Sequence, residues 1–259
     1  MPGEVRSRRL SADFGARTLS SPNTLTSTAA SRDVSGVARD ARLYDRDRNL
    51  HYTAPTLRGW THLLFFEVSL VVGTVLIATA QGATETFAAA IYAATLSGLF
   101  GVSALYHRGK WRPPARRMLQ RADQVMILLL IAGSATPAFL LAVTGRAGVT
   151  GLCVLWALAL TAAACRVFWL NAPPRLVGGI YLGLGWMAGL ALPAVWIRFG
   201  AEPVVLLTTG GVLYTVGALV YYRRRPDPIP AVFGYHEVFH AFVCAAATCQ
   251  FLATALFIL

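Results

Sequence analysis

The sequence has little charge for its length. Only 14% of its 259 residues are charged, whereas a soluble domain carries about 25%. Lysine is nearly missing, because Lys110 is the only one, and arginine dominates the formal net charge of +11. Ten of the 23 basic residues precede Gly59, and most of the others fall in short groups between long apolar blocks. This distribution is typical of a membrane protein and argues against a nucleic-acid-binding protein.

Features of secreted and disulfide-rich proteins are also scarce. The four cysteines form no CxxC pair and lie inside apolar blocks, so we interpret them as packing residues. The first 50 residues contain no apolar segment of the kind found in a signal peptide. Repeated aspartates such as Asp33 and Asp40 argue against a transit peptide. We expect residues 1–58 to be a disordered, basic cytoplasmic tail and residues 59–259 to form the membrane domain.

Seven apolar blocks are each long enough to cross a bilayer. A hydrocarbon core about 30 Å thick needs roughly 20 apolar residues in a helix, and a lone strand or loop cannot satisfy its backbone in lipid. The predicted fold is therefore all-α, a polytopic membrane protein with seven transmembrane helices. The predicted spans are 59–80, 86–106, 122–143, 149–169, 176–197, 204–222 and 236–259.

The charges between these blocks alternate along the chain. The tail and the connections 108–121, 166–175 and 223–225 are basic, whereas the other three connections hold two arginines between them. Basic loops stay in the cytoplasm. The alternation predicts a cytoplasmic N-terminus and a C-terminus outside, and it supports the count of seven independently of hydropathy.

Glycine and proline inside the spans suggest local packing features. Pro137 predicts a kink in the third span. Small residues at Gly178, Gly179, Gly183 and Gly185, and again at Gly210-Gly211, are expected to allow close approach between helices.

Ionisable and polar groups inside membrane helices are costly, so each one suggests a function. His236 and His240 are four residues apart on one helix face, where both can bind one metal ion. His107 ends the second span, and Asp123 opens the third. The predicted topology brings them to the same cytoplasmic depth. The candidates are His62, Glu67, Ser103, His107, Asp123, His236, Glu237 and His240.

Three histidines and a water molecule form the ligand set of a catalytic zinc ion. We therefore predict His107, His236 and His240 as ligands of zinc, which acidifies its bound water towards pH 7. Asp123 would act as a base or hold that water. Ser103, four residues before His107, would hydrogen-bond the water or a developing oxyanion.

Other interpretations remain open for several of these residues. His236–His240 also fits HExxH, which would make Glu237 the general base of an intramembrane protease, with His107 as the third ligand. His62 lines the site or anchors the first span at the interface. Glu67 lies deeper and is expected to be hydrogen-bonded or protonated.

Several separated motifs resemble the hemolysin III proteins, the bacterial branch of the progestin and adiponectin receptor (PAQR) family. They are Ser103-Ala-Leu-Tyr-His107, Arg121-Ala-Asp123, Ile131–Pro137, Gly210–Ala218 and Phe233–His240. The likeness begins near residue 58 and excludes the tail. In one departure, Arg58 stands where the first motif of the family has an asparagine, and no glutamate precedes it.

The resemblance implies a seven-helix fold with zinc near the cytoplasmic face of a bacterial cell membrane. It implies His107, His236 and His240 as ligands, with Asp123 and Ser103 near the zinc water. The family is similar to the alkaline ceramidases, which suggests a zinc-dependent hydrolase of a lipid amide or ester. The alternatives are a sensor or receptor of membrane state with structural zinc, and a cytolytic pore. Expected partners are membrane lipids, not nucleic acid.

Overall fold

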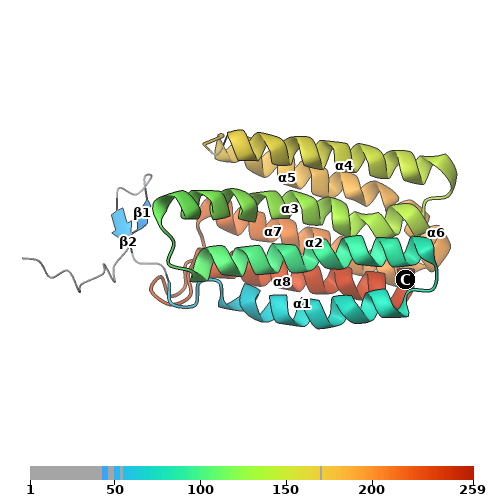
Figure 1. Cartoon of the computed structure of the whole chain (residues 1–259), viewed down its shortest axis with the longest axis horizontal. Helices are drawn as coiled ribbons and strands as arrows, with labels where there is room; N and C mark the ends of the chain where they lie inside the picture. Colours follow the sequence, from blue (N-terminus) through green and yellow to red (C-terminus); the bar gives the residue numbers. More distant parts are fainter. Residues whose placement is uncertain (1–42, 46–49, 53–54, 170) are drawn as a thin grey trace, which may run out of the picture. The chain divides into compact units, whose positions relative to one another are not determined.

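The computed structural model describes residues 43–45, 50–52, 55–169 and 171–259. Within these residues the membrane domain is helical (Figure 1). Two short strands, β1 (Leu43–Asp45) and β2 (Leu50–Tyr52), pair in antiparallel register. The helices are α1 (Trp60–Thr79), α2 (Ala83–Arg108), α3 (Pro113–Leu141), α4 (Gly145–Phe168), α5 (Pro174–Ala188), α6 (Leu192–Phe199), α7 (Ala201–Arg223) and α8 (Tyr235–Ala253). A 3₁₀ turn (Gly189–Ala191) links α5 to α6, and a π-helical turn (Thr254–Ile258) follows α8.

Seven spans are present among the described residues, as the sequence predicts. Six are α1, α2, α3, α4, α7 and α8 with its π-helical extension, and the seventh is the continuous segment Pro174–Phe199. The single predicted span 176–197 is thus divided into α5, the 3₁₀ turn and α6. Pro193, in the first turn of α6, lacks the N–H that a continuous helix would bond to Gly189, and this explains the break. The orientation of the spans stays a prediction.

The start of α3 differs most from its predicted boundary. The helix begins at Pro113, nine residues before the predicted position 122, with proline in its first turn. Proline suits this position because the first N–H groups of a helix have no partner within the helix. Arg116, Arg117 and Arg121 therefore lie on α3 and not in a connecting loop. Near its other end α3 continues through Pro137 to Leu141.

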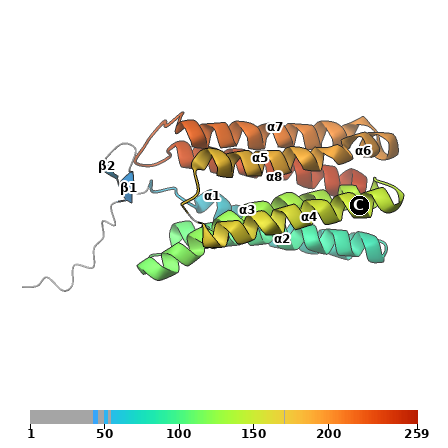
Figure 2. The same ribbon diagram turned by 90° about the horizontal axis from the view of Figure 1, so that it is seen from above.

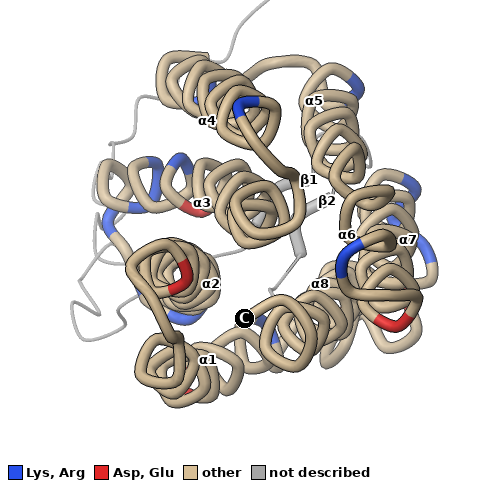
Figure 3. The backbone as a smooth tube through the Cα atoms, turned by 90° about the vertical axis from the view of Figure 1, so that its right-hand side faces the viewer, with Lys and Arg blue, Asp and Glu red and all other residues tan. Residues whose placement is uncertain are grey.

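Consecutive helices pack side by side, and α8 lies against both α7 and α1 (Figures 2 and 3). Tyr92 and Phe100 are buried in a core between α1, α2, α3 and α8. A second core, around Leu128 and Leu155, joins α3, α4 and α5. Little charge is carried by the helices in the end-on view of Figure 3, as expected for segments that lie in lipid.

Large apolar side chains cover the outside of these helices. Phe168, Leu190 and Ile197 are 87%, 72% and 85% exposed, and a soluble monomer rarely presents so many such residues. This surface fits contact with lipid. Cys153 and Cys165 also lie exposed, so the interpretation of the cysteines as packing residues is wrong for these two.

The expected role of the glycines of the fifth span is also wrong. A β-carbon placed at Gly178, Gly179, Gly183 or Gly185 would meet no described atom within 4 Å, so these residues permit no close helix contact. Repeated small residues do not reveal which face of a helix meets a neighbour. At Gly210, by contrast, a β-carbon would lie 3.1 Å from the carbonyl oxygen of Ala246, and here α7 does approach α8 closely.

Most of the predicted tail, residues 1–58, lies outside the described residues. The last part of it is ordered against the loop before α8. The backbone N–H groups of Thr56 and Leu57 donate to the carbonyl oxygens of Ala231 and Val232, at 3.1 and 3.2 Å. The ordered structure therefore starts before residue 59, and this pairing brings the start of α1 beside the start of α8.

Candidate metal centre

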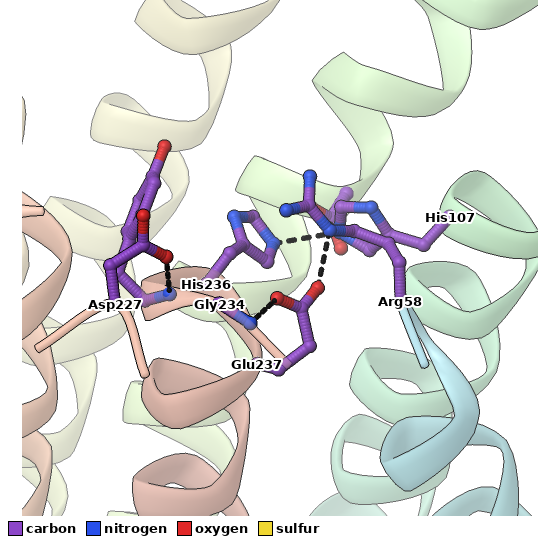
Figure 4. Close-up of polar contacts among 8 residues, drawn as sticks. Arg58, His107, Asp227, Gly234, His236 and Glu237 are labelled. Carbon is purple, nitrogen blue, oxygen red and sulfur yellow. Dashed lines mark hydrogen bonds and ion pairs between the residues drawn. The ribbon is translucent and has the colours of Figure 1, made fainter. Parts of the chain in front are cut away.

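Three histidines from two helices meet at one end of the bundle. His107 lies in the last turn of α2, and His236 and His240 lie in the first two turns of α8. The Nε2 atoms of His107 and His236 are 3.3 Å apart (Figure 4). One ring nitrogen from each of the three lies within 4.8 Å of the other two. The structure thus brings together the three residues predicted as ligands.

The donor set and its spacing fit a zinc ion. Zinc–nitrogen bonds of about 2.0–2.1 Å at tetrahedral angles put two ligand nitrogens about 3.3 Å apart. The separation of the two Nε2 atoms matches this value. Three protein ligands are also typical of zinc sites that keep one coordination position open for chemistry. Among the described residues this is the one group of histidine, cysteine and carboxylate side chains close enough to hold a metal ion.

Asp123 and Ser103 lie beside the three histidines. Asp123 lies in the third turn of α3, and its Oδ2 atom is 3.9 Å from Nε2 of His107. Ser103 precedes His107 by one helical turn on the same face of α2. Ser103 is 2% exposed, and its hydroxyl lies close enough to the carboxyl group of Asp123 to interact with it. A carboxyl group held at this position can exchange a proton with a group bound near His107.

The residue before α1 has to be glycine for this arrangement. Gly59 has φ +78°, a left-handed conformation that other residues adopt at a cost. A β-carbon at Gly59 would lie 2.8 Å from the β-carbon of His107, so any larger residue would push against this candidate ligand. The chain therefore uses Gly59 both to turn into α1 and to let α1 approach the end of α2.

Carboxyl groups fix the start of α8, which carries the other two histidines. Oε2 of Glu237 accepts the backbone N–H of Gly234 at 2.9 Å, and Oδ1 of Asp227 accepts the backbone N–H of Tyr235 at 2.9 Å (Figure 4). Both groups occupy the end of the helix dipole that favours negative charge. The first turn of α8 is therefore anchored where His236 begins the site.

An ion pair joins the start of α8 to the segment before α1. Nε of Arg58 donates to Oε1 of Glu237 at 2.5 Å (Figure 4). The two side chains are 10% and 2% exposed. Arg58 is the residue that departs from the first motif of the resembled family, and its charge is used here to pair with Glu237.

This pairing bears directly on the protease interpretation of HExxH. Both carboxylate oxygens of Glu237 are engaged, one by Arg58 and one by the backbone of Gly234. A general base needs an oxygen directed at the attacking water. Glu237 thus links the start of α8 to the segment before α1. This geometry argues against the zincin interpretation.

The two candidates on α1 lie in different surroundings. His62 is 3% exposed and stacks on His240, so it lines the site and is not an interfacial anchor. Glu67 is on the exposed outer face of α1, and the described residues give it no hydrogen bond of the kind expected from its depth in the helix.

Two contacts of the site escaped prediction from the sequence. Arg58 and Glu237 are 179 residues apart, and no spacing rule links them. The stack of His62 on His240 likewise joins two helices that are distant in the chain. The one available signal was the unusual presence of an arginine just before an apolar helix and of a histidine in its first turn.

Comparisons with known proteins identify the family of the chain. A family model described as "Haemolysin-III related" matches residues 50–251. The protein named "Hemolysin-3 homolog" of Bacillus subtilis (strain 168) is 31% identical over 134 residues, which cover 52% of this chain and 60% of that protein. "Hemolysin-3" of Bacillus cereus is 26% identical over 178 residues, covering 68% of this chain and 78% of that protein.

The family match covers well over half of the chain, and the chain belongs to the hemolysin III family. With its seven apolar helices, it is a multi-pass integral membrane protein of the bacterial cell membrane.

Proposed function

We propose that this member of the hemolysin III family is a zinc-dependent hydrolase that cleaves an amide or ester bond of a membrane lipid. The observation that carries the proposal is the meeting of His107, His236 and His240 with Asp123 at one end of the bundle. Zinc held by three imidazoles supplies Lewis acidity and an acidified water at neutral pH.

Asp123 would move the proton in this reaction. Its carboxylate would take a proton from the water whose oxygen attacks the lipid carbonyl carbon. It would return that proton to the leaving amine or alcohol as the carbon–nitrogen or carbon–oxygen bond breaks. A hydrogen bond from Ser103 would hold the carboxylate in place. In this arrangement the main role of Ser103 is to position the carboxylate of Asp123. A direct hydrogen bond from Ser103 to an oxyanion would be its second role.

The position of the site supports a lipid as substrate. The ligands come from the end of α2 and the start of α8, so they lie near the boundary of the hydrocarbon core. The amide and ester bonds of membrane lipids lie at this same boundary. An aqueous substrate would have to reach a site whose ligands are largely buried.

Hydrolysis can be tested with purified protein in liposomes made from bacterial lipids. We expect the zinc-loaded wild type to release fatty acid, detected by mass spectrometry, and a chelator to stop the release. Asp123→Asn should keep zinc but lose activity by a factor of about 100 or more, as expected for a proton-transfer group. The proposal fails if zinc-loaded wild type releases no more fatty acid than Asp123→Asn.

A second candidate function is a non-enzymatic sensor with a structural metal ion. It is supported by the origin of the ligands, because a metal ion would tie the end of α2 to the start of α8. It predicts one zinc ion per chain and lower thermal stability after chelation, without turnover of any lipid. The names of the two Bacillus relatives also suggest cytolysis, and dye leakage from the same liposomes would reveal it.

A further inference from the structure

We infer that His62 is a positioning residue that fixes the imidazole of His240 in the orientation needed to bind a metal ion. This inference rests on the metal centre proposed above and does not depend on hydrolysis. It assigns a role to a side chain outside the predicted ligand set.

The two rings lie face to face. Their centroids are 3.7 Å apart, and their planes differ by 9°, which is a direct parallel stack. The ring of His62 also receives Phe100 edge-on, with centroids 5.1 Å apart and planes at 81°. His62 is therefore held between a core aromatic residue of α2 and a candidate metal ligand of α8. Because rings packed this closely leave each other little room to turn, this stack restricts rotation of the His240 ring.

The usual means of orienting a metal-binding histidine is missing at His240. Such a histidine normally donates a hydrogen bond from its second ring nitrogen to a carboxylate or carbonyl, which fixes the ring. With His240 binding through Nε2, as the pairing of His107 and His236 suggests, its second nitrogen is Nδ1. That atom is buried and has no hydrogen-bond partner among the described residues. The flat contact with His62 takes the place of this hydrogen bond.

His62 makes no hydrogen bond that would explain its presence in another way. Both of its ring nitrogens are buried without a partner in the described part of the chain, an arrangement that costs free energy. The start of α1 is nevertheless fixed firmly, because Arg58 pairs with Glu237 and Gly59 packs on His107. The His62 ring is thus held against His240 by a firmly fixed helix start. The flat shape of the ring, and not its nitrogens, is what orients His240.

The test compares variants that keep or remove the ring. His62→Phe keeps an aromatic face without nitrogens, and His62→Leu removes the ring. Phe65→Leu is the matched control, because Phe65 also packs on Phe100, with centroids 5.4 Å apart. Within the described part of the chain, Phe65 makes no ring contact with the candidate ligands. Zinc affinity is measured in detergent by competition with a chromophoric chelator. The visible spectrum of the Co²⁺-loaded protein reports ligand geometry, and the unfolding temperature without metal reports folding.

We expect His62→Leu to weaken zinc binding about tenfold or more, the scale found when orienting partners of metal ligands are lost, and to alter the cobalt spectrum. His62→Phe should restore both to near wild type, within about threefold in affinity, and Phe65→Leu should change neither. If His62→Leu does not fold, His62→Met provides the same comparison with a flexible side chain.

Wild-type zinc affinity in His62→Leu would overturn this inference and leave the proposed metal centre untouched. So would a loss of affinity in His62→Phe as large as in His62→Leu, because the nitrogens would then be what the site requires. Wild-type protein that binds no metal ion would overturn both this inference and the metal centre.

Discussion

The buried pair of Arg58 and Glu237 leads to a prediction about stability that can be worked out from the structure. Replacing Arg58 with methionine keeps much of the side-chain volume but leaves the carboxylate of Glu237 with one partner, the backbone N–H of Gly234. Opposite charges about 4 Å apart interact by about 4 kcal/mol at an effective dielectric constant of 20. Breaking a buried ion pair from one side typically costs about 3–5 kcal/mol.

We therefore expect Arg58→Met to lower the free energy of unfolding by about 3 kcal/mol. The double variant Arg58→Met/Glu237→Gln should be more stable than Arg58→Met alone, because no unpaired charge is then buried and the glutamine oxygen still accepts the N–H of Gly234. Free energies would be measured by SDS titration in mixed micelles, with helicity as the signal. Arg175→Met is the control, since Arg175 is exposed and donates to the Tyr222 hydroxyl, and it should leave stability unchanged.

The reasoning would be refuted by either of two results. One is a loss smaller than about 1 kcal/mol for Arg58→Met, the size found for exposed pairs. The other is a double variant less stable than Arg58→Met, which would mean that the glutamate charge itself stabilises the fold without its partner.

Further substitutions separate the effects of backbone conformation, packing and metal. Gly59→Ala should lower both the zinc affinity and the free energy of unfolding. Gly145 also has a positive φ (+69°), but a β-carbon there would meet no atom within 4 Å. Gly145→Ala should therefore show the cost of backbone strain alone, about 1–2 kcal/mol, in the same SDS titration. Gly183→Ala should be neutral or stabilising by about 0.5–1 kcal/mol, because its face is open, and Gly217→Ala should destabilise, because its new carbon would lie 2.9 Å from the β-carbon of Phe242. Elemental analysis should find zinc in wild type and little in His236→Ala, and a chelator should lower the unfolding temperature of wild type only.

The spans were predictable because the bilayer imposes their length. Any apolar stretch of about 20 residues that lies in lipid has to be helical, and seven such stretches were found where expected. Boundaries were harder to predict where charge lies on a helix. The basic residues before Asp123 resembled a loop, but Pro113 starts α3 early and the helix carries them.

The candidate site was predictable to the extent that its residues follow helical spacing. His236 and His240 share a face because they are four residues apart, and Ser103 and His107 repeat that spacing. Contacts that depend on how helices meet were not predictable, such as the ion pair of Arg58 with Glu237. For the same reason, glycines of the fifth span resembled packing residues and proved to face open space.

The placement of the ligands also has a consequence for biogenesis. One candidate ligand lies at residue 107, and the other two lie on α8, the seventh of the described spans. A nascent chain that has inserted six spans therefore holds a single ligand and cannot trap a metal ion with useful affinity. Two contacts that hold the start of α1 at the site also need residues made late in synthesis. They are the ion pair of Arg58 with Glu237 and the backbone hydrogen bonds to residues 231 and 232. Metal capture would thus have to wait until α8 has entered the membrane beside α2.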